Sequence, residues 1–294
     1  MPLLAEVTST IEEIRTKVGP SLVGVGQRWG VGSGVVLAPG RVLTNAHNIR
    51  GEQITVSFAD GRTETGTIAG VDVDGDLAVV NVDTKDAPAL EWADGENVTI
   101  GSAILALSNP GGRGLRVTIG LVSGTERSFR GPRGTRITGS IEHTAPLLPG
   151  SSGGPIVDEQ GRLLGLNTNR LGEGFYLAIP ADTDLRERAD ALAKGEAPER
   201  PRLGVALAPN EVARKMRAAV GLPEADGLLV RGVAEDGPAS KAGIAEGDLI
   251  TAVNGTALTD ADELHNALSK TKKGASITLT VLRGTEERTV SVTF

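Results

Sequence analysis

Short runs of Val, Ile and Leu, separated by glycine-containing turns, fill the chain from position 21 to about 181. Each run has the length of a strand, and Asp60-Gly61 and Gln160-Gly161 are typical turn signals between them. A strand series with no helix between its members indicates an all-β barrel or sandwich. The expected strands are Ser21–Val25, Gly34–Leu37, Gln53–Phe58, Leu77–Val82, Ala103–Leu107 and Pro155–Leu166.

Helical spacing precedes and follows this β region. Ile11, Ile14 and Val18 recur on one face, which predicts a helix over Thr8–Val18. The stretch Thr183–Lys194 is rich in Arg, Glu, Ala and Leu, and it predicts a second helix.

The segment Gly195–Pro201 carries charges, a glycine and two prolines, which is typical of a linker between domains. We therefore predict a first domain over residues 1–184, a helix and linker over 185–201, and a second domain over 202–294. The second domain mixes strands with two helices, of which Asp260–Ser269 is the clearer.

Composition agrees with this division. A chain of 294 residues suits about two domains. Glycine is abundant, at 40 residues, as short strands joined by tight turns require, and with 2% aromatic residues the cores must consist mainly of aliphatic side chains. The chain has no cysteine, so it has neither disulfides nor thiol chemistry.

Charge and hydropathy bear on partners and location. A net charge of −7 argues against nucleic acid or an anionic membrane as the main partner. The sequence has no run of apolar residues long enough to span a bilayer, and its first residues do not form a secretory signal. We expect a cytoplasmic protein, or alternatively a cell-envelope protein if an upstream targeting segment is missing from this chain.

A serine in a glycine-rich turn is the first candidate for chemistry. The segment Pro149–Pro155 reads PGSSGGP. An acyl-transfer enzyme must expose a serine hydroxyl on a sharp turn and direct backbone N–H groups at the developing oxyanion. A plain Gly/Ser turn is the alternative. We choose Ser152 as the nucleophile because Gly-Gly-Pro follows it, and we expect an oxyanion hole from the N–H groups of Gly150 and Ser152, with Ser151 in the same loop.

A histidine and an aspartate complete a candidate triad. His47 follows an apolar strand; taken alone, it is better explained by a structural role. Asp76 adjoins the apolar run Leu77–Val80, and the acid of a triad must be buried to hold the imidazole in its working tautomer. We expect Asp72 and Asp74, in the preceding turn, to be solvated.

The order His–Asp–Ser is that of the chymotrypsin barrels, whereas subtilisin and the α/β-hydrolases order their triads differently. We therefore predict a mainly β protein, with a chymotrypsin-like double β-barrel protease domain followed by an α+β domain. In this mechanism His47 takes the proton of Ser152 and Asp76 orients His47. No metal or organic cofactor is needed, and the sequence shows no metal-ligand cluster.

These motifs resemble those of the HtrA (Deg) family of trypsin-like serine proteases with C-terminal PDZ domains. The resemblance runs from about Thr10 to Phe294 and implies an ATP-independent endopeptidase that acts on unfolded or damaged proteins. The matching segments are Thr44–His47, Asp76–Val79, Ser108–Gly111, Val117–Ser123, Gly150–Pro155 and Phe175–Pro180.

The chain also departs from the family pattern. Asn48 and Ser151 stand where the family usually has Val and Asn. The resemblance places Pro146 and Leu147 in the primary specificity pocket, where trypsin-type enzymes keep an acidic residue for Arg or Lys. An apolar pocket cannot pair a buried cation, so cleavage after apolar residues is expected. We take His143, in the same stretch, as structural.

The resemblance identifies the second domain as a PDZ domain, which captures an extended peptide beside a sheet edge and its C-terminal carboxylate in a loop of backbone N–H groups. Leu203, Gly204 and Val205 would form that loop, and Leu264 and Leu268 would line the groove from a helix. The alternative is that Gly204 is a simple turn and the helix face is core. The matching segments are Arg202–Ala206, Gly237–Gly243, Glu246–Ile250 and Val253–Gly255.

The expected partners are unfolded protein or peptide substrates, and C-terminal peptides at the PDZ domain. Relatives are often trimers held by N-terminal aromatic residues; residues 1–28 contain none, so the resemblance alone carries the expectation of a homotrimer. Two other functions stay open: a non-enzymatic chaperone or scaffold that works through the PDZ domain, and a small-substrate esterase on the same fold.

Overall fold

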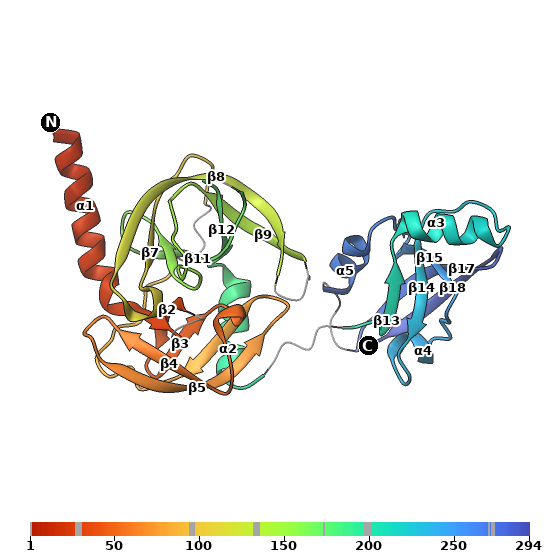
Figure 1. Ribbon diagram of the computed structural model, residues 1–294, viewed down its shortest axis with the longest axis horizontal. Coiled ribbons are helices and arrows are strands. Elements are labelled where there is room, and N and C mark those ends of the chain that lie inside the picture. Colours follow the sequence, from red (N-terminus) through yellow and green to blue (C-terminus); the bar gives the residue numbers. More distant parts are fainter. Residues whose placement is uncertain are drawn as a thin grey trace. The chain divides into compact units, whose positions relative to one another are not determined.

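The chain divides into two compact units, residues 1–198 and 199–294 (Figure 1). The computed structural model describes residues 2–26, 31–93, 98–131, 136–172, 174–196, 201–269, 271 and 274–294. The mainly β architecture expected from the sequence, with two barrels followed by an α+β unit, is confirmed.

The first unit contains two closed antiparallel barrels. The strand orders are β1-β2-β3-β6-β5-β4 and β10-β11-β12-β9-β8-β7. The first barrel consists of β1 (Leu22–Val25), β2 (Gly32–Ala38), β3 (Arg41–Thr44), β4 (Gln53–Phe58), β5 (Thr63–Asp72) and β6 (Leu77–Asn81). The second consists of β7 (Ala103–Ser108), β8 (Arg116–Arg130), β9 (Arg136–His143), β10 (Pro155–Val157), β11 (Leu163–Arg170) and β12 (Tyr176–Pro180).

Alternation along the strands divides the apolar side chains between two kinds of core. In β1, Val23 points into the first barrel, while Leu22 belongs to the core that the barrels share. In β6, Val80 points inward and Val79 joins the shared core. The shared core therefore holds the two barrels together. The last residues of β3 and β11 and the first residues of β6 lie close to one another beside it.

One strand prediction was wrong. Pro155–Leu166 is not continuous but forms β10 and β11, joined by a turn in which the Asp158 N–H donates to the Arg162 carbonyl. Gly161 adopts φ +76° in this turn, a conformation that few residues other than glycine tolerate. The Gln160-Gly161 turn signal was therefore the better guide.

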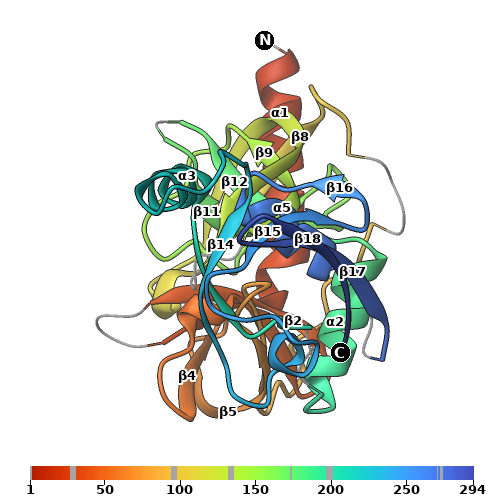
Figure 2. The same ribbon diagram turned by 90° about the vertical axis from the view of Figure 1, so that its right-hand side faces the viewer.

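The described residues of the first unit form two α-helices, α1 (Pro2–Val18) and α2 (Thr183–Ala193). α1 begins before the predicted Thr8, and its first turns extend beyond the barrels (Figures 1 and 2). Three short 3₁₀ turns accompany them, namely η1 (Gly19–Ser21), η2 (Ala46–Asn48) and η3 (Pro110–Gly112).

α2 packs against the barrels of the first unit. The Asp182 carboxylate caps its start by accepting from the Leu185 N–H. Its buried residues Leu185, Ala189 and Leu192 pack into the shared core.

The second unit is a sheet with strand order β13-β14-β15-β17-β18, and β16 pairs with β15. The part of this unit that the structure describes has three helices rather than the expected two, and one of them, α4, has only four residues. The elements are β13 (Val205–Ala208), α3 (Asn210–Ala219), β14 (Leu228–Val233), α4 (Pro238–Lys241), β15 (Leu249–Val253), β16 (Thr256–Ala257), α5 (Ala261–Ser269), β17 (Ser276–Arg283) and β18 (Glu286–Thr293).

Candidate active site

The first barrel brings His47 and Asp76 together. His47 lies in η2, directly after β3, and Asp76 lies directly before β6. β3 and β6 are antiparallel neighbours with Thr44 opposite Ala78. A residue that follows one strand therefore meets a residue that precedes the other.

The His47 ring is held by the Asp76 carboxylate. Nδ1 lies 2.9 Å from both carboxylate oxygens, and the His47 backbone N–H donates to Oδ1 over 3.1 Å. Asp76 is 1% exposed, whereas the His47 side chain is 35% exposed. An ionised carboxylate can only accept hydrogen bonds, so the hydrogen of neutral His47 sits on Nδ1 and Nε2 is free to accept a proton.

The Asp76 loop is fixed from several sides. Asp76 adopts φ +54°, and its Oδ2 accepts a 2.5 Å hydrogen bond from the Thr168 hydroxyl. The Asn45 side chain donates to its carbonyl over 3.0 Å. Thr168, on the second barrel, therefore helps to hold the Asp76 carboxylate in place. The sequence had not indicated this residue.

The expectation that Asp72 is solvated was wrong. Asp72 is 4% exposed, and its Oδ1 accepts from the Gly75 N–H over 2.9 Å. Its Oδ2 lies 3.5 Å from an Arg188 guanidinium nitrogen on α2. The carboxylate is buried because it closes the loop that presents Asp76; Asp74 is half-buried.

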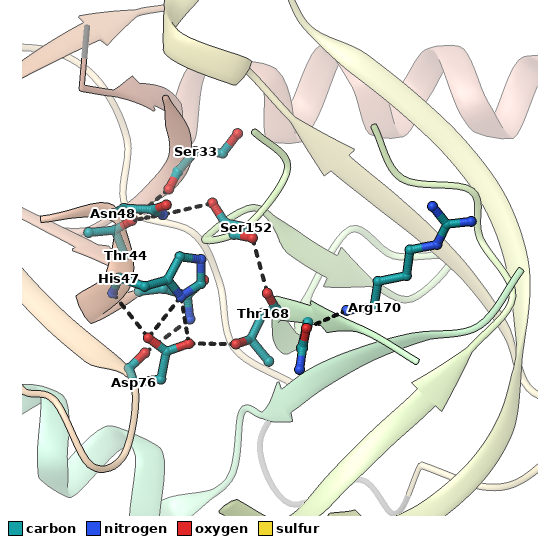
Figure 3. A network of polar contacts seen from close by, with 10 residues as sticks. Ser33, Thr44, His47, Asn48, Asp76, Ser152, Thr168 and Arg170 are labelled. Carbon is teal, nitrogen blue, oxygen red and sulfur yellow. Dashed lines mark hydrogen bonds and ion pairs between the residues drawn. The ribbon is translucent and has the colours of Figure 1, made fainter. Parts of the chain in front are cut away.

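Ser152 precedes β10 in the second barrel and faces the His47 side of the first. Figure 3 shows the His47 ring between Asp76 and Ser152. The Ser152 hydroxyl donates to the Thr168 carbonyl over 3.0 Å, and the described residues give it no hydrogen bond to His47. A rotation about its Cα–Cβ bond is needed before His47 can take its proton, a rearrangement that substrate-free sites commonly require.

The backbone of Ser152 is anchored to the first barrel. Its carbonyl accepts from the Ser33 N–H over 2.8 Å and from the Asn48 side-chain amide over 2.9 Å (Figure 3). Asn48 also donates to the Thr44 hydroxyl over 3.0 Å. The residue after His47 therefore ties the histidine segment to the serine segment.

The two serines of the turn differ in environment. The Ser151 side chain is 3% exposed and its hydroxyl donates to Ser108 over 3.1 Å. The Ser151 N–H donates to the Leu148 carbonyl, so it is not available to an oxyanion. Gly150 adopts φ +88°. Its N–H and that of Ser152 have no acceptor among the described residues, and they stay the candidate donors.

Gly153 shows why the turn needs glycine. Its φ is +87°, and a Cβ there would lie 2.0 Å from the Ser33 carbonyl oxygen. A side chain would push the turn away from the first barrel and break the anchor on Ser152.

A cleft of about 460 Å³ opens over these groups. Leu147 lines it as expected, but Pro146 is exposed and is not among the lining residues. The lining residues are His47, Asp76, Phe129, Arg130, Gly131, Leu147, Leu148, Pro149, Gly150, Ser151, Ser152, Asn167, Thr168, Asn169, Arg170 and Tyr176. The polar run Asn167–Arg170, which follows the apolar residues Leu163–Leu166 within β11, lines this cleft. That run is the sequence signal that would have pointed to these lining residues.

His143 has partners that the sequence did not reveal. It is fully buried, its Nε2 lies 2.9 Å from Asn167 Oδ1, and its ring stacks on Tyr176 at 5.8 Å. Burial lowers the pKa of His143 to about 4, although the Asn167 hydrogen bond acts in the opposite direction. His143 is therefore neutral near pH 7 and supports two residues of the cleft wall.

In the second unit, β13 lies at the edge of the sheet and, among the described residues, pairs only with β14. Gly204, directly before β13, adopts φ +77°. Leu203, Leu264 and Leu268 are buried together in the core of this unit, and Val205 packs against them half-buried. The structure thus brings the expected groove residues together, with most of their surface inside the core.

The residues that the structure describes contain no cluster of His, Asp or Glu able to hold a metal ion. They also contain no helix with the length and apolarity needed to cross a membrane.

Comparison with known proteins agrees with this geometry. Residues 32–166 match the family model of the trypsin-like peptidase domain, and residues 201–294 match that of the PDZ domain. The structure of the HtrA-type protease AlgW with tripeptide is 30% identical, covers 96% of both chains and superposes with a TM-score of 0.70. The chain belongs to the HtrA family. A second AlgW structure, with decapeptide, gives a TM-score of 0.76 at 27% identity, covering 96% of this chain and 97% of that chain.

Curated relatives in the HtrA family include a probable periplasmic serine endoprotease DegP-like of Halomonas elongata, which is 32% identical over 91% of this chain and 56% of its own length. Protease Do-like 1, chloroplastic, of Arabidopsis thaliana is 33% identical over 90% of this chain and 63% of its own length. The chain therefore spans less than two thirds of these relatives.

Proposed function

We propose that this HtrA-family chain is an ATP-independent serine endopeptidase that cleaves unfolded or damaged proteins, with His47, Asp76 and Ser152 as its catalytic triad. The observation that carries the proposal is the buried Asp76 carboxylate, 2.9 Å from the His47 ring, beside a serine on a glycine-rich turn. The relatives named as serine endoproteases support it.

The reaction follows from these groups. After the Ser152 hydroxyl rotates from the Thr168 carbonyl, His47 Nε2 removes its proton and the oxygen attacks a peptide carbonyl. The N–H groups of Gly150 and Ser152 stabilise the oxyanion; one such donor typically contributes about 3 kcal/mol. Protonated His47 then gives its proton to the leaving amine, and a water activated by His47 hydrolyses the acyl-enzyme.

We also propose cleavage after apolar residues. The apolar part of the cleft lining includes Leu147, Leu148, Phe129 and Tyr176. Mapping the cut sites in casein by mass spectrometry tests this preference, and a dominance of Lys or Arg before the cuts would refute it.

The second unit is proposed to bind the C-terminal carboxylate of peptides at the loop Leu203–Val205, with the peptide added as a strand beside β13. Its support is the edge position of β13 and the match to the PDZ family model. The domain boundaries 1–184, 185–201 and 202–294 and a homotrimer stay predictions.

The cellular compartment belongs to the same proposal. The first two curated relatives are named as periplasmic and chloroplastic, which favours the cell-envelope alternative over the cytoplasmic one. Fractionation of cells that express the full gene, with antibody detection of this chain, tests it.

Digestion of β-casein by the wild type and by Ser152→Ala tests the catalytic proposal. The wild type should release fragments without ATP, and Ser152→Ala should release none. A chaperone or scaffold would leave casein intact in both cases. An esterase would hydrolyse small esters and leave casein intact.

A further inference from the structure

Two arginines line the cleft beside the candidate triad. Arg130 is the last residue of β8 and Arg170 the last residue of β11, and both are exposed. Among the described lining residues, Asp76 is the sole carboxylate, and its oxygens accept from His47 and Thr168. Arg170 therefore places a positive charge at the cleft, although the chain as a whole has a net charge of −7.

Arg170 is held in a defined position. Its Nε donates to the Gly172 carbonyl over 2.8 Å, and its guanidinium carbon lies 6.0 Å from the centre of the Tyr176 ring. Its backbone N–H donates to the Asn169 side chain over 2.8 Å. These contacts restrain the side chain of Arg170, which is one of the residues that line the cleft.

The position of Arg170 relative to Ser152 follows from the geometry of β11. Thr168, whose carbonyl accepts from the Ser152 hydroxyl over 3.0 Å, stands two residues before Arg170 on β11 (Figure 3). Two strand residues span about 7 Å. An extended peptide advances at the same rate per residue, so the guanidinium reaches side chains within about four residues of the scissile bond.

We propose that Arg170 forms a subsite for the carboxylate of an Asp or Glu side chain in the peptide substrate. The proposal rests on the proposed peptidase function and adds a charge preference to it: an apolar residue at the cut and an acidic residue nearby. Guanidinium groups pair carboxylates through parallel N–H donors.

The test uses peptides with one central apolar residue, in which a single Glu is moved through the four positions on each side of that residue. Each peptide has a matched Gln version, and all carry amidated C-termini so that carboxylate capture by the second unit does not contribute. At one or two positions, wild-type kcat/KM should be about five times higher for Glu than for Gln, and this ratio should fall as salt is raised.

Variants of Arg170 test whether this residue causes the preference for Glu over Gln. Arg170→Gln should bring the Glu/Gln ratio close to unity, Arg170→Lys should keep most of it, and Arg170→Glu should reverse it. Arg116→Gln removes an exposed arginine of β8 outside the cleft lining and should leave the ratio unchanged. A wild-type ratio near unity at every position would overturn the proposal, as would a ratio that survives in Arg170→Gln.

Affinity separates this proposal from the peptidase proposal. If no peptide is cleaved, the peptidase proposal fails, but the dissociation constants of the same amidated peptides for Ser152→Ala still decide the subsite. Glu peptides should bind Ser152→Ala about five times more tightly than Gln peptides. Equal binding would overturn the subsite whatever the catalytic result.

Discussion

At the residue scale, Asn48 is the departure from the family pattern with the clearest structural consequence. Its amide bridges the Ser152 carbonyl and the Thr44 hydroxyl and is 5% exposed. A Cβ on Gly32 would lie 2.3 Å from the Asn48 side chain, so this site has little room to rearrange. We interpret Asn48 as a positioning residue for Ser152.

We predict that Asn48→Val lowers kcat on peptides about tenfold with little change in KM, because one buried hydrogen bond to the serine backbone is lost. Asn48→Gln, which keeps the amide, should recover part of kcat. The melting temperature serves as the control. A normal kcat in Asn48→Val, or a loss that only follows a lowered melting temperature, would contradict the positioning role.

His143 makes a separate prediction about acid stability. Its pKa is about 4 in the folded chain, and its ordinary value is 6.5. The unfolded chain therefore takes up a proton first as the pH falls. The contribution of neutral His143 to the free energy of unfolding is fully present above pH 6.5 and is lost as the pH falls toward 4. At pH 4.5 this loss is about 2–3 kcal/mol.

Urea unfolding of the wild type and His143→Gln at pH 7.5 and pH 4.5 checks this. Carboxylates destabilise both proteins in acid, so the comparison between them isolates the histidine. His143→Gln should lose less stability on acidification than the wild type. An equal loss in the two proteins would show that His143 does not titrate as its burial requires.

At the scale of elements, the sequence predicted what depends on local pattern. Apolar runs between turn signals predicted β1, β2, β4, β6 and β7, and the composition of Thr183–Lys194 predicted α2. Contacts between distant segments could not be predicted in this way. Thr168 reaches Asp76 across the two barrels, and Arg188 reaches Asp72 from α2; neither pair has a sequence signature, because only the tertiary fold brings its members together.

The edge of β13 carries the prediction for the second unit. Full-length Ser152→Ala should bind a peptide with a free apolar C-terminus at least about tenfold more tightly than its amidated form, since amidation removes a charge-assisted hydrogen bond. Calorimetry with matched peptides measures both constants. Equal affinities would leave Gly204 as a simple turn and the α5 face as core.

At the scale of the whole molecule, the two units are expected to influence each other. A peptide at the second unit can change protease activity only if it binds one arrangement of the catalytic loops better than another. We predict that the free-acid peptide changes casein turnover by the full chain and that the amidated peptide has much less effect. Identical turnover with either peptide would make the second unit a passive attachment.

The central claim is that Ser152, activated by His47 and Asp76, is the nucleophile of the whole molecule. The most direct test is labelling with a fluorophosphonate, followed by mass spectrometry to locate the adduct. We predict one adduct per chain, on Ser152, absent from Ser152→Ala and retained in Ser151→Ala. An adduct on Ser151, or no adduct on the folded wild type, would contradict it.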